Sequence, residues 1–78
     1  MPTFYFDFHD TNGVLRDEAG DELPSAIVAR KEAIETVGHA LKDLTFRHSD
    51  GRIMIEVRDC DGPILSVSGV IATTSFRE

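Results

Sequence analysis

The sequence predicts an α+β fold with the element order ββαββ, in which one helix packs on one face of a small, mostly antiparallel sheet. Three observations predict it. The opening residues FYFDFHD carry phenylalanine at every second position, a later stretch of about twenty residues spaces its apolar residues with the helical period, and two more alternating stretches follow. A helix with one apolar stripe and strands with one apolar face bury these apolar surfaces against each other when the helix covers the sheet. The pattern leaves the order of the strands open.

The first two strands are predicted from alternation and from a turn. Residues Thr3–His9 place phenylalanines on one side and polar residues on the other, which is typical of a half-buried strand. Asn12 and Gly13 both tolerate positive φ and predict a hairpin turn, after which Val14–Arg16 forms a short returning strand. The charged stretch 17–24, DEAGDELP, is expected to be a loop that leads into the helix.

The helix is predicted from about Ser25 to Leu44, with Ser25 as its N-cap. At about 100° per residue, the small and apolar side chains fall on one arc, which predicts close approach to a sheet. The residues on this arc are Ala26, Ala33, Ile34, Val37, Ala40, Leu41 and Leu44.

Two more strands are predicted after the helix. Residues Arg52–Asp59 alternate again, the turn 61–63 follows, and Ile64–Ile71 is the last clear strand, while Thr73–Glu78 either extends it or frays. The predicted core comprises Phe4, Phe6, Phe8, Ile34, Val37, Leu41, Ile53, Ile55, Val57, Leu65 and Val67.

Composition indicates one soluble globular domain over residues 1–78, since 41% of the chain is hydrophobic and 28% is charged. No apolar run approaches the roughly 18 residues of a membrane-spanning helix, and no signal peptide opens the chain. Cys60 is the single cysteine, so no disulfide within the chain and no cysteine metal cluster is expected. We therefore expect a cytoplasmic protein without a membrane partner.

The net charge argues against a nucleic-acid partner. Eight basic residues against 14 acidic ones give a net charge of −6, which repels phosphate backbones. Arg47, His48 and Arg52 lie close together in sequence, but Asp50 stands among them and no aromatic residues interleave with them. We interpret these residues as a solvated connection.

The polar side of the first strand allows two interpretations. Asp7 and His9 share a strand face, and Glu56 lies on the outward face of a later strand; together they would suit zinc or another divalent ion. Alternatively, these residues form the wet face of the sheet, with Arg58 pairing across strands to Asp7. The second interpretation is favoured.

Arg30 falls near the centre of the predicted apolar arc, where a guanidinium needs a partner or a route to water along its aliphatic stem. Glu22, Asp17 and Asp59 are candidate partners, and a structural ion pair between Arg30 and Glu22 is preferred over an anion-binding role.

Motifs for catalysis are lacking. The acidic stretch 17–22 does not match the spacing of a calcium loop, and the acidic neighbours of Cys60 do not favour a reactive thiol. No nucleophile and base stand at a convincing spacing, and no glycine-rich phosphate loop is present. The sequence predicts no enzyme and no cofactor.

Four stretches together resemble a family of short bacterial proteins classed as a domain of unknown function. They are FYFDFHD, RDEAGDELP, AIVARKEAI and IEVRDCDG, and the likeness extends from Thr3 to about Val67. It implies a stand-alone cytoplasmic bacterial protein and brings no catalytic or binding residues. The tail IATTSFRE is longer and more strand-like than the resemblance implies. A fainter similarity to HicB-type antitoxins lacks the glycine-rich signatures of that family.

The functional expectation is a non-enzymatic protein-interaction or regulatory module, possible as a homodimer. Its expected partner surface comprises Tyr5, Met54, Arg58 and Val70, next to edge strands open to pairing. The alternatives are the divalent-metal or small-molecule site around Asp7, and an antitoxin-like regulator.

Overall fold

The computed structural model describes residues 1–77, and the last residue of the predicted tail, Glu78, lies outside the described residues. One helix and five strands confirm the α+β class, with strands before and after the helix. The elements are β1 (Thr3–Asp10), β2 (Gly13–Leu15), β3 (Asp21–Glu22), α1 (Ala26–Phe46), β4 (Gly51–Asp59) and β5 (Gly62–Ile71). The strand β3 was expected to be loop, and β5 begins two residues earlier than predicted and includes Pro63.

The sheet has the order β2-β1-β4-β5, and β3 pairs with the start of β1. All pairs are antiparallel. Phe6 is paired with Val57 and Phe8 with Ile55, so the phenylalanines share a face with the apolar residues of β4. This register confirms the predicted separation of an apolar face from a polar one.

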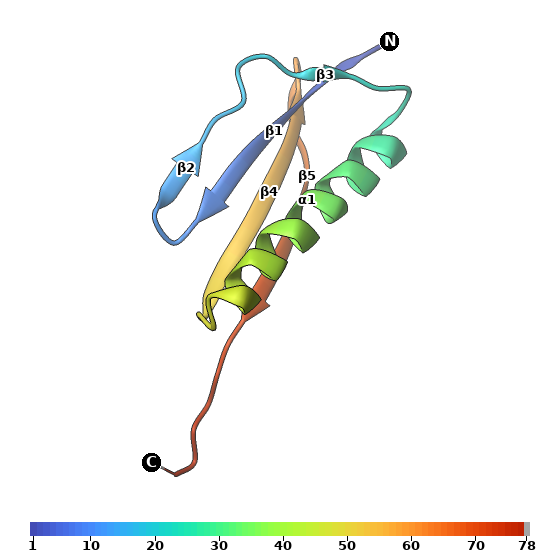
Figure 1. Cartoon of the computed structure of the whole chain (residues 1–78). Helices are drawn as coiled ribbons and strands as arrows, with labels where there is room; N and C mark the ends of the chain where they lie inside the picture. The colour runs from blue at the N-terminus through green and yellow to red at the C-terminus, as the bar shows by residue number, and fades with distance from the viewer. Residues whose placement is uncertain (78) are drawn as a thin grey trace.

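The helix α1 begins after Ser25, whose side chain accepts a hydrogen bond from the Val28 N–H at 3.4 Å, so the predicted N-cap is confirmed. It continues two residues past the predicted end, to Phe46. The helix packs on β4 and β5, and β1 and β2 extend beyond its cover (Figure 1). Phe6 and Phe8 are therefore only half-buried. Among residues 1–77, no helix combines the length and apolar character needed to cross a membrane.

The core differs from the predicted one on the helix. Its buried apolar residues are Phe4, Ala29, Ala33, Val37, Ile53, Ile55 and Val57, and Phe6, Phe8, Leu41, Leu65 and Val67 pack around them. Ile34 is 42% exposed, so its predicted place in the core is wrong. The buried stripe follows alanines four residues apart, and Ile34 lies one residue beyond Ala33, about 100° around the helix. Burying Ile55, which is 1% exposed, contributes about 1.5–3 kcal/mol.

The approach of α1 to β5 depends on Gly69. A Cβ at this position would collide with the Leu41 side chain and would lie 3.0 Å from Val37 Cγ1. The small alanines of the helix and this glycine together let the helix backbone come close to the sheet.

The two long edges of the sheet differ. The outer edge of β1 is closed by β2 at one end and by β3 at the other. Between them, the Phe6 N–H donates to the Asp17 carboxylate at 3.1 Å, so a side chain continues the hydrogen bonding where no strand is paired. On the opposite side, β5 ends the sheet, and no strand among residues 1–77 pairs with the outer side of its ten residues.

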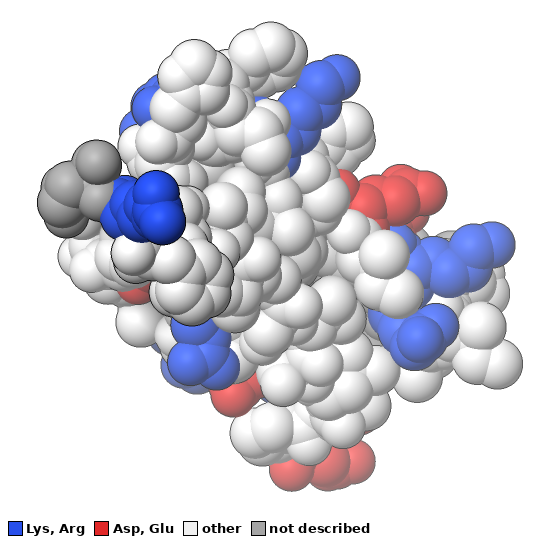
Figure 2. Space-filling model, turned by 90° about the horizontal axis from the view of Figure 1, so that it is seen from below, with Lys and Arg blue, Asp and Glu red and all other residues white. Residues whose placement is uncertain are grey.

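The charged residues are not spread evenly over the surface. Seen from below, the Lys, Arg, Asp and Glu side chains lie around the margin of the molecule, and a broad central area has none (Figure 2). An uneven distribution of this kind leaves uncharged surface available for contact with another molecule.

Candidate functional site

The polar face of the sheet carries a buried carboxylate. Asp7 is only 3% exposed, although it points away from the helix. Its Oδ2 accepts a hydrogen bond from Arg58 Nε at 2.8 Å, and its Oδ1 accepts one from the Asp17 N–H at 2.9 Å. The predicted pairing of Arg58 with Asp7 across strands is therefore present, and the chain around Asp17 buries it.

Asp17 ties the loop after β2 to this face of the sheet. Its carboxylate accepts the N–H groups of Phe6, Ala19 and Gly20 at 3.0–3.1 Å. Its carbonyl oxygen accepts a bond from Arg58 Nη2 at 2.6 Å. Gly20 has φ +74°, where a side chain would meet Thr3, so the turn requires glycine at this position.

The electrostatics of this cluster follow from its hydrogen bonds. The Arg58 guanidinium lowers the pKa of Asp7 below its usual 3.8, against the opposing effect of burial. Burial raises the pKa of Asp17, but the three N–H donors outweigh it and the pKa is lowered. The ring of Tyr5 lies under the guanidinium at 4.5 Å and adds a cation–π contact. Every member of the cluster thus stabilises another member.

The three residues of the predicted metal site do not gather into a ligand set. Both oxygens of Asp7 are occupied, and Glu56 is paired across from it on β4. Among residues 1–77, no three His, Cys, Asp or Glu side chains lie where they could hold a metal ion. The arginine that neutralises Asp7 takes the place that a cation would need.

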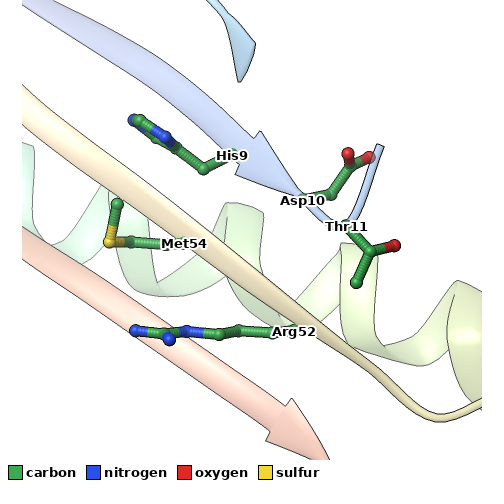
Figure 3. A pocket seen from close by; sticks show the side chains of 5 residues that line it. All are labelled: His9, Asp10, Thr11, Arg52 and Met54. Carbon is green, nitrogen blue, oxygen red and sulfur yellow. The ribbon is translucent and has the colours of Figure 1, made fainter. Parts of the chain in front are cut away.

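His9 lies in a different environment from Asp7. It lines a hollow of about 310 Å³ with Asp10, Thr11, Arg52 and Met54. The His9, Met54 and Arg52 side chains extend in the same direction over this end of β1 and β4 (Figure 3). His9 Nε2 is buried without a hydrogen-bond partner among the described residues. The hollow is shallow and mostly apolar, and Asp10 uses one oxygen to hold the following turn.

The residues of the predicted partner surface lie in two environments. Tyr5 and Arg58 belong to the Asp7 cluster, and Met54 is half-buried beside His9. Val70, on β5, is 60% exposed. Only the Val70 side of the predicted surface is thus fully open.

The predicted ion pair between Arg30 and Glu22 is wrong. Both residues are exposed, and the ion pairs among residues 1–77 are Arg58–Asp7 and Arg47–Asp43. Arg30 falls between Val37 and Leu41 around the helix axis, and its exposed side chain reaches water without a carboxylate partner among residues 1–77.

The direction of the peptide groups makes β5 a candidate interaction element. The Phe6 N–H points to Asp17, away from β4, and Phe6 is paired with Val57. Because peptide groups alternate in direction along a strand, those of Val57 point to β5 and meet Leu65. The same alternation leaves the N–H and C=O groups of three residues on the open edge. They are Ser66, Ser68 and Val70.

The role of Asp17 was missed at the sequence level. The stretch DEAG, from Asp17 to Gly20, has the signature of an Asx turn, in which the aspartate accepts N–H groups two and three residues later. That signal predicts the local turn. The bond to Phe6 depends on tertiary structure and has no signal in the sequence.

The fold is thus a small α+β domain in which the loop after β2 covers Asp7 on the polar sheet face and the β5 edge is open. The chain belongs to the family described as Domain of unknown function (DUF6894), whose model matches residues 3–70. The resemblance inferred from the four stretches is therefore confirmed at the level of a domain of unknown function. No curated protein and no solved structure matches the chain.

Proposed function

We propose that this protein is a non-enzymatic protein-interaction module that binds an extended segment of another protein along β5. Strand addition of this kind gains its affinity from main-chain hydrogen bonds. The observation that carries the proposal is the open edge, where Ser66, Ser68 and Val70 present unpaired N–H and C=O groups. The free thiol of Cys60 fits a reducing compartment, and the proposal places the protein in the cytoplasm.

The length and composition of β5 support this proposal. The strand has ten residues, against about five or six in an average strand, and none of them is charged. Exposed edges are commonly protected by lysine, by short length or by a covering loop. The bulge at Val57/Arg58 and Pro63 interrupt only the first end of β5, so the stretch from Leu65 to Ile71 is available for pairing.

The carboxylates with shifted pKa values support a non-enzymatic role. The pKa values of Asp7 and Asp17 are lowered by hydrogen bonds from the Arg58 side chain and from backbone N–H groups of the same cluster. The pKa of Asp50 is lowered by the side chain and N–H of Thr73, which hold the start of the tail. A structural ion-pair network accounts for such shifts without a reaction.

A proline substitution tests strand addition. Ser68→Pro removes an N–H that points outward, so the ladder with β4 and the fold should persist. The probe is an acetylated, amidated ten-residue peptide in which valine and threonine alternate, added to ¹⁵N-labelled protein. We expect the amide signals of Ser66, Ser68 and Val70 to shift saturably. Ser68→Pro should abolish the shifts of the remaining amides, whereas Ser75→Pro, in the tail, should leave them unchanged.

Two results would count against the proposal. One is the absence of any shift of the β5 amide signals with this peptide, together with a monomeric mass by light scattering from micromolar to millimolar concentration. The other is binding that Ser68→Pro leaves intact while circular dichroism shows a native fold. Self-association that Ser68→Pro abolishes would support pairing at this edge.

A further inference from the structure

The flank of α1 beside β5 carries a row of apolar side chains. Val37 and Leu41 lie over Gly69 of β5, which defines the side of the helix that faces this strand. At about 100° per residue, Ile34 and Ile27 lie about 20° and 40° beyond Leu41 around the helix axis, away from the sheet. They are 42% and 74% exposed. Ile27, Ile34 and Leu41 follow one another at intervals of seven residues, so they form one continuous row along this flank.

The opposite flank of α1 is polar. Asp43 lines a hollow with Phe8 of β1, so this flank faces β1. Glu32 lies about 20° from Asp43 around the helix axis and His39 about 40° from it, and all three are exposed. The face of the helix that points away from the sheet carries both signs of charge, on Lys31, Glu35 and Lys42. The contrast between the two flanks indicates that the side at β5 meets another molecule.

A second copy of the chain brings a matching surface to this flank. α1 packs on both β4 and β5 (Figure 1), so its axis lies about 2.4 Å, half a strand spacing, inside β5. If the β5 edges of two copies pair, their sheets become continuous and the two helices lie about 10 Å apart on the same face. Helices pack against each other at about 8–10 Å. An added strand without a helix beside it would leave Ile27 and Ile34 in water.

The register of such a pair follows from the peptide groups of β5. Ser66, Ser68 and Val70 point their N–H and C=O groups outward, and a two-fold axis at Ser68 sets Ser66 of one copy opposite Val70 of the other. All three residues then enter hydrogen-bonded pairs. Because β5 carries no charged residue, no like charges oppose each other in this ladder.

The helix of each copy runs alongside its own β5. Leu44 lies over Gly51, which is paired with Ile71, so α1 has the same direction as β5. Two antiparallel β5 strands therefore bring two antiparallel helices side by side.

The helical and strand rises determine which residues of the two helices meet. The contacts of Val37 and Leu41 with Gly69 place the middle of this helical turn, about residue 39, level with that glycine. With about 1.5 Å per helical residue and about 3.3 Å per strand residue, the axis at Ser68 is level with about residue 37. Ile34 and Leu41 lie on either side of this level at similar distances. Ile34 of each copy therefore lies across from Leu41 of the other.

Arg30 also has a favourable position in this arrangement. It lies between Val37 and Leu41 around the helix axis and is level with about Leu65, well before the axis at Ser68. The two-fold axis places it beside the last turn of α1 in the other copy. That turn has no basic residue of its own, and the negative end of the helix dipole stabilises a cation there.

The contact area reaches what a specific dimer needs. The open stretch from Leu65 to Ile71 is about 23 Å long, and a helix layer on a sheet layer is about 20 Å deep. Each copy thus buries about 500 Å², and the two together about 1,000 Å², which is the lower limit for a specific interface. We expect a dissociation constant in the micromolar range.

We propose that the partner at β5 is a second copy of this chain. The β5 strands pair antiparallel about a two-fold axis at Ser68, and the two α1 helices pack through Ile34 and Leu41. This inference rests on the proposed function of β5 and names the occupant of that edge.

A substitution on the helix tests the dimer. Sedimentation equilibrium from micromolar to millimolar concentration should show a monomer–dimer equilibrium for the native protein. Ile34→Lys should raise the dissociation constant at least about tenfold, because both copies then bring a charge into the apolar row. Thr36→Lys makes a matched change on the flank that faces β1 and should change it by less than about twofold. Circular dichroism at 222 nm should show a native helix in both variants.

Cross-linking tests the register. In a Cys60→Ser background, Ser68→Cys places two thiols on directly opposed residues, whose Cα atoms are about 5.5 Å apart and within disulfide range. Ser66→Cys places its two thiols about four residues apart along the paired strands, which is about 13 Å. Mild oxidation followed by non-reducing electrophoresis should give a covalent dimer of Ser68→Cys at least about tenfold faster than of Ser66→Cys.

The outcomes separate this inference from the proposed function. A monomer at millimolar concentration, or a dimer that Ile34→Lys leaves intact, would overturn the inference, as would equal cross-linking of the two cysteine variants. Saturable binding of the valine–threonine peptide to β5 by such a monomer would leave strand addition standing, and its absence would overturn both. Ile34→Lys should still bind this peptide, because its β5 edge is unchanged, whereas Ser68→Pro should lose both the peptide and the dimer.

Discussion

Replacing Asp7 by asparagine tests the cluster on the polar face of the sheet. The carboxylate is 3% exposed and accepts hydrogen bonds from Arg58 at 2.8 Å and from the Asp17 N–H at 2.9 Å. Asparagine has nearly the same shape and can still accept one N–H, but it removes the charge that Arg58 faces. The substitution therefore measures the charge–charge part of the cluster with little change in packing.

The size of the stability loss in Asp7→Asn depends on the contacts that Arg58 retains in the variant. Removing one member of a buried ion pair costs about 3–5 kcal/mol. The Arg58 side chain is 16% exposed and retains its bond to the Asp17 carbonyl and its contact with Tyr5, so the loss lies below that range. We expect Asp7→Asn to lower the free energy of unfolding by about 2–3 kcal/mol. A domain of this size has about 4–12 kcal/mol in total, so the loss is a large fraction of it.

Urea unfolding at pH 7, followed by circular dichroism at 222 nm, measures this difference. The control is Asp43→Asn, which removes the ion pair with Arg47, whose partners are 65% and 64% exposed. That variant should lose less than about 0.5 kcal/mol. A loss below about 1 kcal/mol for Asp7→Asn, or equal losses in both variants, would refute the view that the cluster stabilises the fold.

Three further predictions concern acid, glycine and metal. Because the pKa values of Asp7 and Asp17 are lowered in the folded state, their contribution to stability is present above about pH 4 and is lost as pH falls through the folded values; urea midpoints from pH 6 to pH 2 should decline less in Asp7→Asn than in the native protein. Gly69→Ala should lower stability by about 1–2 kcal/mol because its Cβ collides with the helix, whereas Gly38→Ala, with open space around it, should raise stability by about 0.5–1 kcal/mol; a thermal unfolding midpoint that rises in Gly69→Ala or falls in Gly38→Ala would contradict the packing described. Zinc titration should leave the ring signals of His9 unshifted, because Asp7 is already paired with Arg58, and a saturable shift would restore the metal hypothesis.

Local patterns in the sequence predicted the elements well. The alternation of Thr3–His9 and Arg52–Asp59 assigned each residue to a face of the sheet. When one face is buried, an alternating strand can be placed in only one way, with its apolar residues on that face. Ser25 was predicted as the N-cap because a hydroxyl before an apolar periodic stretch is a local signal. The interaction across strands between Asp7 and Arg58 also followed from the two strand patterns.

Features that depend on how elements meet were not predictable in this way. A helical arc has no sharp centre, so Ile34 was placed in the core when the sheet in fact meets the stripe of Ala29 and Ala33. The order of the strands, and hence the open edge at β5, depends on pairing between distant segments. Asp17 bonds to a strand eleven residues away, and no local spacing encodes that contact.

The Asp17 carboxylate occupies the lateral side of β1 at Phe6, between the three-residue β2 and the two-residue β3. A second chain therefore finds no long acceptor strand on that side, and β5 of one molecule cannot dock on β1 of the next. Head-to-tail growth into a fibre is blocked at the first step. If a segment of another protein adds to β5 as proposed, the β1 side of the same chain offers no second site for such an addition.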